Sequence, residues 1–161
     1  MRDHSRAKSR VLKDPRLQLA PMQKSDVVEV VRLESRCYEF PWTESIFLDC
    51  LGVGYCCWTC RLNGKLVGYG IMSVAVGEAH ILNICVDSEF RDQGLGRRML
   101  ERLLNLARKH QADTVFLEVR ESNMAAQCLY QSLGFNEVGL RRGYYPAGKG
   151  RENAIVLALT L

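Results

Sequence analysis

The stretch VDSEFRDQGLGRRML, from Val86 to Leu100, decides how the middle of this chain folds. It runs from the apolar end of a predicted strand through a turn into a predicted helix. Glycine is about 1 kcal/mol worse than alanine inside a helix, yet Gly94 and Gly96 stand where this helix should begin. Helix starts carry unpaired N–H groups, and glycines let an anion approach them. With Arg91 and Arg97 nearby, the pattern predicts a pyrophosphate cradle; the alternative is a turn that uses glycine only for its φ angles.

Two common phosphate-binding motifs do not fit this turn. The dinucleotide fingerprint G-x-G-x-x-G fails because Met99 occupies the place of its third glycine. The P-loop fails because no G-K-[ST] follows the glycines. The sequence therefore indicates an anion-binding turn of another kind.

Hydrophobic patterns on both sides of the turn predict a mixed α/β domain. Strand character is found in residues 16–22, 55–62, 65–74, 79–86, 114–120, 136–145 and 152–161, and Asn63-Gly64 predicts a type I′ hairpin between two of them. Helical periodicity predicts four helices: one after Ser25 or Asp26, one after Thr43, one after the glycine turn, and one over residues 122–135. The predicted order is β-α-α-β-β-β-α-β-α-β-β.

Composition indicates one globular domain without a membrane span. The chain has 161 residues, of which 47% are hydrophobic and 25% charged, with a net charge of +4. This mild basicity slightly favours anionic partners such as phosphates or RNA-rich particles. No apolar run reaches the roughly 18 residues of a membrane helix. We expect residues 1–16 to form a flexible basic arm rather than a secretory signal, residues 17–161 to form a single domain, and the protein to be cytoplasmic.

The seven cysteines include one pair, Cys57 and Cys60, at C-x-x-C spacing. This pair is either a redox or half-zinc site, or ordinary packing in a strand. The surrounding pattern is that of a strand, in which residues three apart point to opposite faces. There is no second C-x-x-C, and His4, His80 and His110 are isolated in the sequence. We therefore favour packing with reduced thiols and predict no metal site.

Several polar and aromatic residues allow more than one interpretation. Glu118, in the middle of a strand and on the face of Phe116, is either a catalytic base or the partner of an ion pair with Arg120 or Arg141. Tyr130 lies on the apolar stripe of its helix, and the pattern alone favours a core tyrosine. Asn123 is suited to cap the same helix together with Ser122.

Aromatic residues at two places suggest a binding slot for substrate. Tyr144 and Tyr145 stand beside Arg141 and Arg142 in the predicted loop of the last hairpin, and Phe40-Pro41-Trp42 breaks the first helix. The functional interpretation makes them opposite walls of a peptide slot. The alternative is a loop that is packed by its own aromatic side chains.

The segment Arg91-Asp92-Gln93-Gly94-Leu95-Gly96 resembles the R/Q-x-x-G-x-G/A motif of the GNAT superfamily of N-acetyltransferases. The blocks LEVRESNMAAQCLYQSLGF and RRGYYPAGKGRENAIVLAL, with the upstream FPW, are similar to the RimI group within that superfamily. The resemblance extends from about Leu17 to the C-terminus. It implies the GNAT fold: a mixed, mostly antiparallel seven-stranded sheet flanked by four helices.

The resemblance also implies a chemistry and a set of residues. Acetyl-CoA is the co-substrate, Glu118 takes a proton from the substrate amine through water, and Tyr130 protonates the leaving thiolate. Transfer is direct, so Cys85 is not a nucleophile, and no histidine is placed in sequence to activate it. The implied cofactor-binding residues are Ile84, Cys85, Val86, Arg91, Asp92, Gln93, Gly94, Leu95, Gly96, Arg97, Asn123 and Tyr130, and the implied substrate-binding residues are Phe40, Trp42, Tyr144 and Tyr145.

In the RimI group the acceptor is the N-terminal alanine of a small-subunit ribosomal protein. The expected partners are therefore that N-terminal peptide and acetyl-CoA, with no direct binding of nucleic acid and no membrane. Two alternatives remain open at this point. One is a lysine or small-amine acetyltransferase of the same fold, and the other is a non-catalytic module that binds acetyl-CoA.

Overall fold

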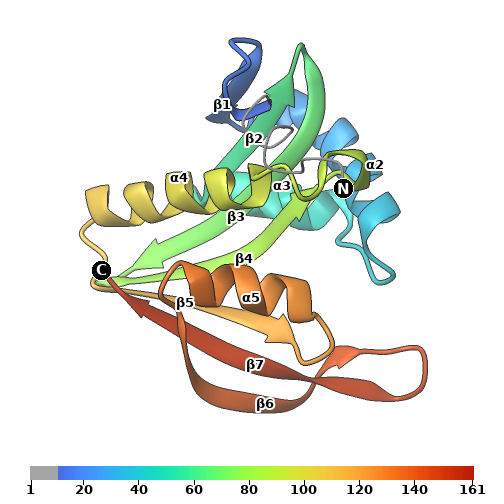
Figure 1. Cartoon of the computed structure of the whole chain (residues 1–161). Helices are drawn as coiled ribbons and strands as arrows, with labels where there is room; N and C mark the ends of the chain where they lie inside the picture. Colours follow the sequence, from blue (N-terminus) through green and yellow to red (C-terminus); the bar gives the residue numbers. More distant parts are fainter. Residues whose placement is uncertain (1–10) are drawn as a thin grey trace, which may run out of the picture. The chain divides into compact units, whose positions relative to one another are not determined.

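The computed structural model describes residues 11–161, and its elements follow the predicted order (Figure 1). The strands are β1 (Leu17–Pro21), β2 (Cys56–Leu62), β3 (Lys65–Ala75), β4 (Glu78–Val86), β5 (Thr114–Arg120), β6 (Asn136–Pro146) and β7 (Arg151–Thr160). The α-helices that lie wholly within this range are α2 (Val27–Cys37), α3 (Glu44–Gly52), α4 (Leu95–Lys109) and α5 (Met124–Ser132). Short 3-10 turns, Lys24–Asp26 and Ser88–Phe90, precede α2 and the glycine turn.

The strands form one seven-stranded sheet in the order β1-β2-β3-β4-β5-β7-β6. β4 and β5 pair in parallel from Glu78 opposite Thr114 to Ile81 opposite Leu117. The pairs β1–β2, β2–β3, β5–β7 and β6–β7 are antiparallel. The predicted mixed, mostly antiparallel sheet and the order of elements are confirmed.

The described chain divides into two compact units. Unit 1 contains the chain up to Met72 together with Asn83–Leu103, and unit 2 contains Ser73–Leu82 and Leu104–Leu161.

Unit 1 is built on the first three strands. Leu95 and Met99 at the start of α4 form a buried cluster with Cys60 and Val67, and residues of β1 pack around it. On α3, the ring of Phe47 packs edge-on against Tyr69 of β3, with ring centroids 5.7 Å apart. Met99, Leu100 and Leu103 of α4 are buried at the spacing of one helix face.

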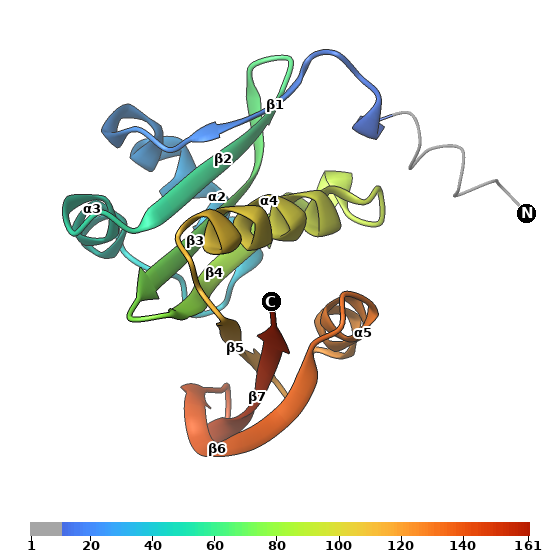
Figure 2. The same cartoon turned by 90° about the vertical axis from the view of Figure 1, so that its left-hand side faces the viewer.

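Unit 2 ends in a long hairpin of β6 and β7, drawn in orange and red in Figure 2. Tyr145 pairs with Glu152 and Pro146 with Arg151, so β6 continues through both tyrosines. The predicted strand over residues 136–145 is therefore confirmed. The placement of Tyr144 and Tyr145 in the hairpin loop is wrong, because strand pairing extends as far as Pro146 and the turn begins after it.

The predicted hairpin turn is confirmed, whereas the residues that precede α2 and α3 do not cap these helices with their side chains. Asn63 and Gly64 both have left-handed φ angles, of 51° and 81°, as the predicted type I′ hairpin turn requires. Thr43 and Asp26 are the N-cap residues of α3 and α2, but neither side chain makes a capping hydrogen bond. The Asp26 carboxylate instead accepts from the Gln23 amide and from Arg61.

The structure describes residues 11–16 of the flexible arm that was expected, and residues 1–10, including His4, lie outside the described residues. Val11 packs against the buried cluster of unit 1, and the Asn63 amide donates to the Arg16 carbonyl at 3.1 Å. The described part of the arm thus contacts the rest of unit 1 at both of its ends. No helix within residues 11–161 is both long enough and apolar enough to cross a membrane.

Candidate active site

The glycine turn leads directly into α4 in unit 1. Asp92 and Gly94 adopt left-handed φ angles of 60° and 86°, and the Gly94 carbonyl accepts a hydrogen bond from the Arg98 amide at 3.0 Å. The first amides of an α-helix have no acceptor within the helix, so the start of this 15-residue helix offers donors and positive potential to an anion. The φ angle of Gly94 also supports the conformational explanation for that glycine, so the two predicted roles are compatible.

Leu12 lies against this turn. A Cβ atom added to Gly94 would come within 3.0 Å of Leu12 Cδ1. An apolar side chain of the N-terminal segment, that of Leu12, therefore lies against the backbone of Gly94. A residue with a side chain at position 94 would have to displace Leu12 and also adopt a strained φ angle.

The end of β4 makes contacts through its main chain. The Ile84 carbonyl accepts a hydrogen bond from the Tyr38 hydroxyl at 2.5 Å, and the Val86 carbonyl lies 3.9 Å from the Cys37 thiol. Between them, Cys85 is buried, and this burial, together with the neighbouring Cys37 thiol, raises the pKa of the Cys85 thiol. A thiol held in its protonated form is a poor nucleophile, which agrees with the prediction that Cys85 forms no covalent intermediate.

The buried carboxylate of Glu34 holds the Phe40–Trp42 segment, and sequence reasoning did not identify it. Only 2% of the surface of Glu34 is exposed to solvent. The carboxylate accepts from the Trp42 amide at 3.1 Å, from Asn83 Nδ2 at 3.0 Å and from the Tyr69 hydroxyl. Glu34 thereby ties the segment to β3 and β4. Its position on the apolar stripe of α2, four residues after Val30, is a signal that could have revealed it.

The two aromatic residues of this segment have different surroundings. Trp42 packs on Phe47 with ring centroids 5.4 Å apart, whereas Phe40 is 42% exposed. Trp42 is therefore anchored in unit 1 by its amide and by its ring, and Phe40 presents an apolar surface to solvent.

Glu118 lies in the middle of β5 in unit 2, and its side chain is only 7% exposed. Oε2 lies 2.5 Å from His80 Nε2 of β4, and Oε1 lies 3.4 Å from Arg141 Nε of β6. The ion pair with Arg141 was one of the predicted alternatives. Arg120, the other predicted partner, binds Glu152 instead, at 3.1 Å.

These partners determine the charge of Glu118. Burial raises the pKa of its carboxyl, but the hydrogen bond and charge of His80, with the charge of Arg141, outweigh burial and leave the pKa below its ordinary value. The carboxylate is therefore ionised at neutral pH and is able to accept a proton. The ion pair and the role of a base are compatible, because the same charges that bind Glu118 also keep it deprotonated.

His80 is isolated in the sequence, but the fold places it beside Glu118. In the parallel pairing of β4 and β5, His80 stands opposite Phe116, two residues before Glu118, so the two side chains share a face. Nothing near His80 in the sequence reveals this. The signal is the topology of neighbouring parallel strands, combined with the alternation of side chains along each strand.

Tyr130 and Asn123 occupy the positions that their helix predicts. Tyr130 is buried on α5 and packs edge-on against Phe135, with ring centroids 5.9 Å apart. Burial raises the pKa of its phenol to about 12, so the hydroxyl remains protonated at neutral pH. The Asn123 side chain accepts from the Ala126 amide at 3.1 Å, which confirms its predicted capping role.

Tyr144 and Tyr145 form an aromatic pair at the end of β6. Their ring centroids lie 4.9 Å apart, and the guanidinium groups of Arg141 and Arg120 lie over Tyr144 and Tyr145, respectively, at 5.3 and 4.5 Å. Burial and the nearby charge of Glu118 raise the pKa of Tyr145, and Tyr130 contributes to the same shift. Glu118 and Tyr130 are therefore both near enough to Tyr145 to raise its pKa.

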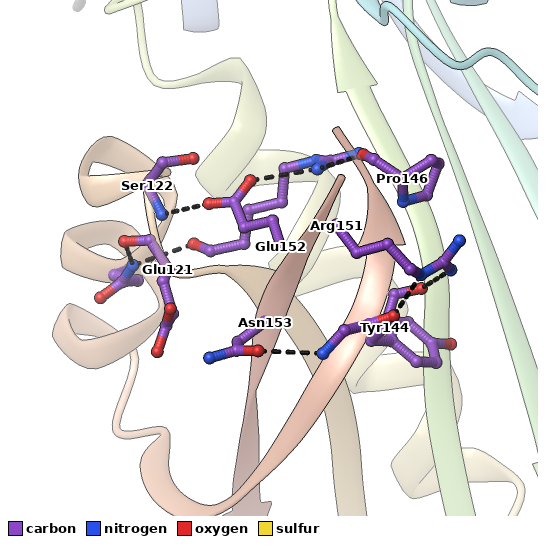
Figure 3. Close-up of polar contacts among 10 residues, drawn as sticks. Glu121, Ser122, Tyr144, Pro146, Arg151, Glu152 and Asn153 are labelled. Carbon is purple, nitrogen blue, oxygen red and sulfur yellow. Dashed lines mark hydrogen bonds and ion pairs between the residues drawn. The ribbon is translucent and has the colours of Figure 1, made fainter. Parts of the chain in front are cut away.

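Polar contacts fix the backbone of this hairpin end (Figure 3). Arg151 donates to the Tyr144 carbonyl at 3.0 Å, and Arg120 donates to the Pro146 carbonyl at 2.9 Å. Glu152 accepts from Arg120 and from the Ser122 amide, at 3.1 and 2.9 Å. Glu152 thus connects the aromatic pair, through Arg120, to the segment that starts α5.

The C-x-x-C cysteines are packing residues of β2. Cys57 and Cys60 are both buried free thiols. Burial raises the pKa of the Cys57 thiol to about 12 and that of the Cys60 thiol to about 11. The prediction of strand packing is confirmed, since both residues lie in β2 and both side chains are buried.

The predicted site residues divide between the two units. Unit 2 brings Glu118, Tyr144 and Tyr145 together around Arg141, with Tyr130 and Asn123 on α5. Unit 1 contains the end of β4, the glycine turn and the Phe40–Trp42 segment. The residues that sequence reasoning missed are Leu12 and Glu34 in unit 1, and His80 in unit 2, which it had taken as isolated.

Comparison with known proteins identifies the family. Residues 27–135 match the Acetyltransferase (GNAT) family. The chain is similar to a ribosomal protein bS18-alanine N-acetyltransferase of Escherichia coli strain K12, with 41% identity over 143 residues that cover 89% of this chain and 97% of that protein. The corresponding enzyme of Salmonella typhimurium is 39% identical over 87% of this chain and 95% of its own length.

A solved structure agrees with the sequence comparison. The crystal structure of the ribosomal-protein-S18-alanine N-acetyltransferase from Escherichia coli matches with a TM-score of 0.85 and 41% identity, covering 89% of this chain and 93% of that chain. The chain therefore belongs to the GNAT family of acetyltransferases, and within it to the RimI group of ribosomal protein bS18-alanine N-acetyltransferases.

Proposed function

We propose that this protein transfers the acetyl group of acetyl-CoA to the N-terminal α-amino group of a protein, namely the N-terminal alanine of the small-subunit ribosomal protein bS18. The observation that carries the proposal is the 41% identity to an enzyme of that name across 97% of its length. On the basis of a ribosomal-protein substrate, the proposal includes a cytoplasmic location.

Acetyl-CoA fits the residues at the start of α4. A pyrophosphate carries negative charge, and it would be bound by main-chain amides of a helix start and by Arg91 and Arg97. The left-handed Asp92 and Gly94 orient this turn, and the end of β4 offers main-chain groups to an extended arm. The proposal assigns cofactor binding to Ile84, Cys85, Val86, Arg91, Asp92, Gln93, Gly94, Leu95, Gly96, Arg97, Asn123 and Tyr130.

Glu118 and Tyr130 are assigned to the two proton transfers. An α-ammonium group has a pKa near 8, so the amine must lose a proton before it can attack the thioester. The ionised, almost buried Glu118 accepts this proton, directly or through a water. The protonated phenol of Tyr130 donates to the thiolate that leaves. Transfer is direct, since Cys85 is buried as a thiol.

Aromatic side chains are assigned to recognition of the peptide. The proposal assigns contacts with the peptide to Phe40 and Trp42 in unit 1 and to Tyr144 and Tyr145 in unit 2. Arg120 holds the ring of Tyr145 and the carbonyl of Pro146 in place. Rigid aromatic side chains at these positions favour a chain terminus over a long lysine side chain.

A comparison of acceptors tests the proposed function. Steady-state rates are measured with acetyl-CoA and three acceptors: a peptide with a free N-terminal alanine, an N-terminally blocked peptide with an internal lysine, and a polyamine. The proposal predicts the highest kcat/KM with the alanine peptide. A preference for lysine or polyamine would assign the protein to another acceptor class, and cofactor binding without turnover would identify a binding module.

A further inference from the structure

The buried base has a partly exposed imidazole beside it. Glu118 is 7% exposed, whereas its partner His80 is 32% exposed, and the two are joined by the 2.5 Å contact between Oε2 and Nε2. His80 thus connects an almost buried carboxylate to solvent. Parallel pairing of β4 with β5 fixes this arrangement, because His80 and Glu118 lie on the same face two register positions apart.

The reaction must release a proton. At neutral pH the acceptor is an ammonium group, which loses two protons when it becomes an amide with one remaining N–H. One of these protons is accounted for at the sulfur: Tyr130 protonates the thiolate as the C–S bond breaks, and the resulting phenolate takes up that proton from the amine. The other has to reach solvent in every cycle, after Glu118 has taken it.

The other neighbours of Glu118 cannot carry that proton. Arg141 pairs with Oε1 at 3.4 Å, but a guanidinium does not deprotonate in proteins. Tyr145, the third titratable group close to Glu118, has a phenol pKa raised by burial and by that same carboxylate. An imidazole exchanges protons readily between about pH 5 and pH 8.

We propose that His80 relays the proton from Glu118 to solvent. For this step His80 is the neutral imidazole that carries its proton on Nδ1, so that Nε2 is free to accept. The amine N–H bond breaks as Glu118 becomes a carboxylic acid, the proton crosses the hydrogen bond to His80 Nε2, and the imidazolium then gives one proton to water and returns to the Nδ1–H form. Glu118 returns to its carboxylate form for the next cycle. His80 acts through Glu118, so it is a positioning and relay residue rather than a group that touches substrate. This inference rests on the proposed function.

A buffer-rescue experiment tests the relay in the full-length protein. In His80→Gln the new side-chain amide can still donate a hydrogen bond to Glu118, but it cannot carry a proton. The matched control is His110→Gln, because His110 is exposed and directly follows α4. Rates with the alanine peptide are measured at increasing concentrations of imidazole buffer. We expect His80→Gln to lower kcat by less than the roughly 10²-fold or more that a general base contributes, to leave the KM for acetyl-CoA unchanged, and to recover activity as buffer is added.

Two outcomes would overturn the relay. One is a His80→Gln enzyme with the kcat of the wild type. The other is a loss of activity that buffer does not restore, which would make the contact a purely structural ion pair. Wild type and His110→Gln should show no dependence on buffer concentration.

A second measurement separates failure of the relay from failure of the proposed function. An inactive wild type would contradict the function itself, and NMR of the His80 ring needs no turnover. The relay requires the ring to change protonation state within about pH 5 to pH 8, and requires Glu118→Gln to move that transition. A ring with one protonation state throughout this range would rule the relay out.

Discussion

Leu12 and Gly94 are in contact: a Cβ atom on Gly94 would stand 3.0 Å from Leu12 Cδ1. The contact joins the N-terminal segment to the turn that we assign to the pyrophosphate. It also means that Gly94 is constrained twice, by its φ angle of 86° and by a neighbour that leaves little room.

Gly94→Ala should raise the KM for acetyl-CoA more than it lowers kcat, because the new side chain strains the turn and displaces Leu12. Gly64→Ala is the control: Gly64 has a φ angle of 81° with nothing within 4 Å of its added Cβ. Both variants should lose about 1–2 kcal/mol of stability from the left-handed φ. Equal KM values in the two variants, or a pure loss of kcat at Gly94, would contradict our assignment of the turn.

Glu118→Gln should reduce kcat by about 10²- to 10⁴-fold, the usual contribution of a general base. The KM for acetyl-CoA should stay close to that of the wild type. Glu121→Gln makes the same chemical change at an exposed position close by in the sequence and should have little effect. Unchanged turnover in the Glu118 variant would remove this residue from the mechanism.

Tyr130→Phe should lower kcat by about 10²-fold with little change in Tm, because the edge-on packing on Phe135 does not involve the hydroxyl. Tyr55→Phe, at a much more exposed tyrosine, is the control. Thermal unfolding and steady-state kinetics are measured on both. A variant that keeps full activity would leave Tyr130 with only its core-packing role.

Glu34→Ala should destabilise the fold by about 3 kcal/mol or more, because it leaves the Trp42 amide, Asn83 and Tyr69 without their buried acceptor. Glu34→Gln should cost less, since its amide oxygen can still accept. Urea unfolding gives both values, and Glu39→Ala, at an exposed position, should lie within about 0.5 kcal/mol of wild type. Equal stability of all three variants would show that the carboxylate does not hold this segment.

The lowered pKa of Glu118 predicts a contribution to acid stability. A carboxyl whose folded pKa lies below its unfolded value stabilises the fold above the ordinary pKa of 4.5, and this stabilisation is lost as the pH falls through the folded value. Urea unfolding of wild type and Glu118→Gln between about pH 7 and pH 3 measures it. The difference between the two proteins should shrink towards low pH; a constant difference would contradict the lowered pKa.

Local patterns in the sequence were sufficient for the order of the elements. The inward stripe of α4, with Met99 and Leu103 buried, follows from helical periodicity alone. The Asn63-Gly64 turn follows from the tolerance of those two residues for left-handed φ angles. The capping role of Asn123 is local in the same way.

Contacts between distant segments could not be predicted in this way. The pairing of His80 with Glu118 depends on which strands are neighbours and in which register, and neither is encoded near His80. Leu12 reaches Gly94 from a segment whose composition suggested only a basic arm.

The most direct test of the proposed activity is thiol release from acetyl-CoA in the presence of two peptides. One begins with a free alanine, and the other is the same peptide already acetylated at its N-terminus. We predict turnover with the free peptide and none above background with the acetylated one, because the α-amine is the acceptor. Equal turnover with both peptides, or none with either, would contradict transfer to the N-terminal amine.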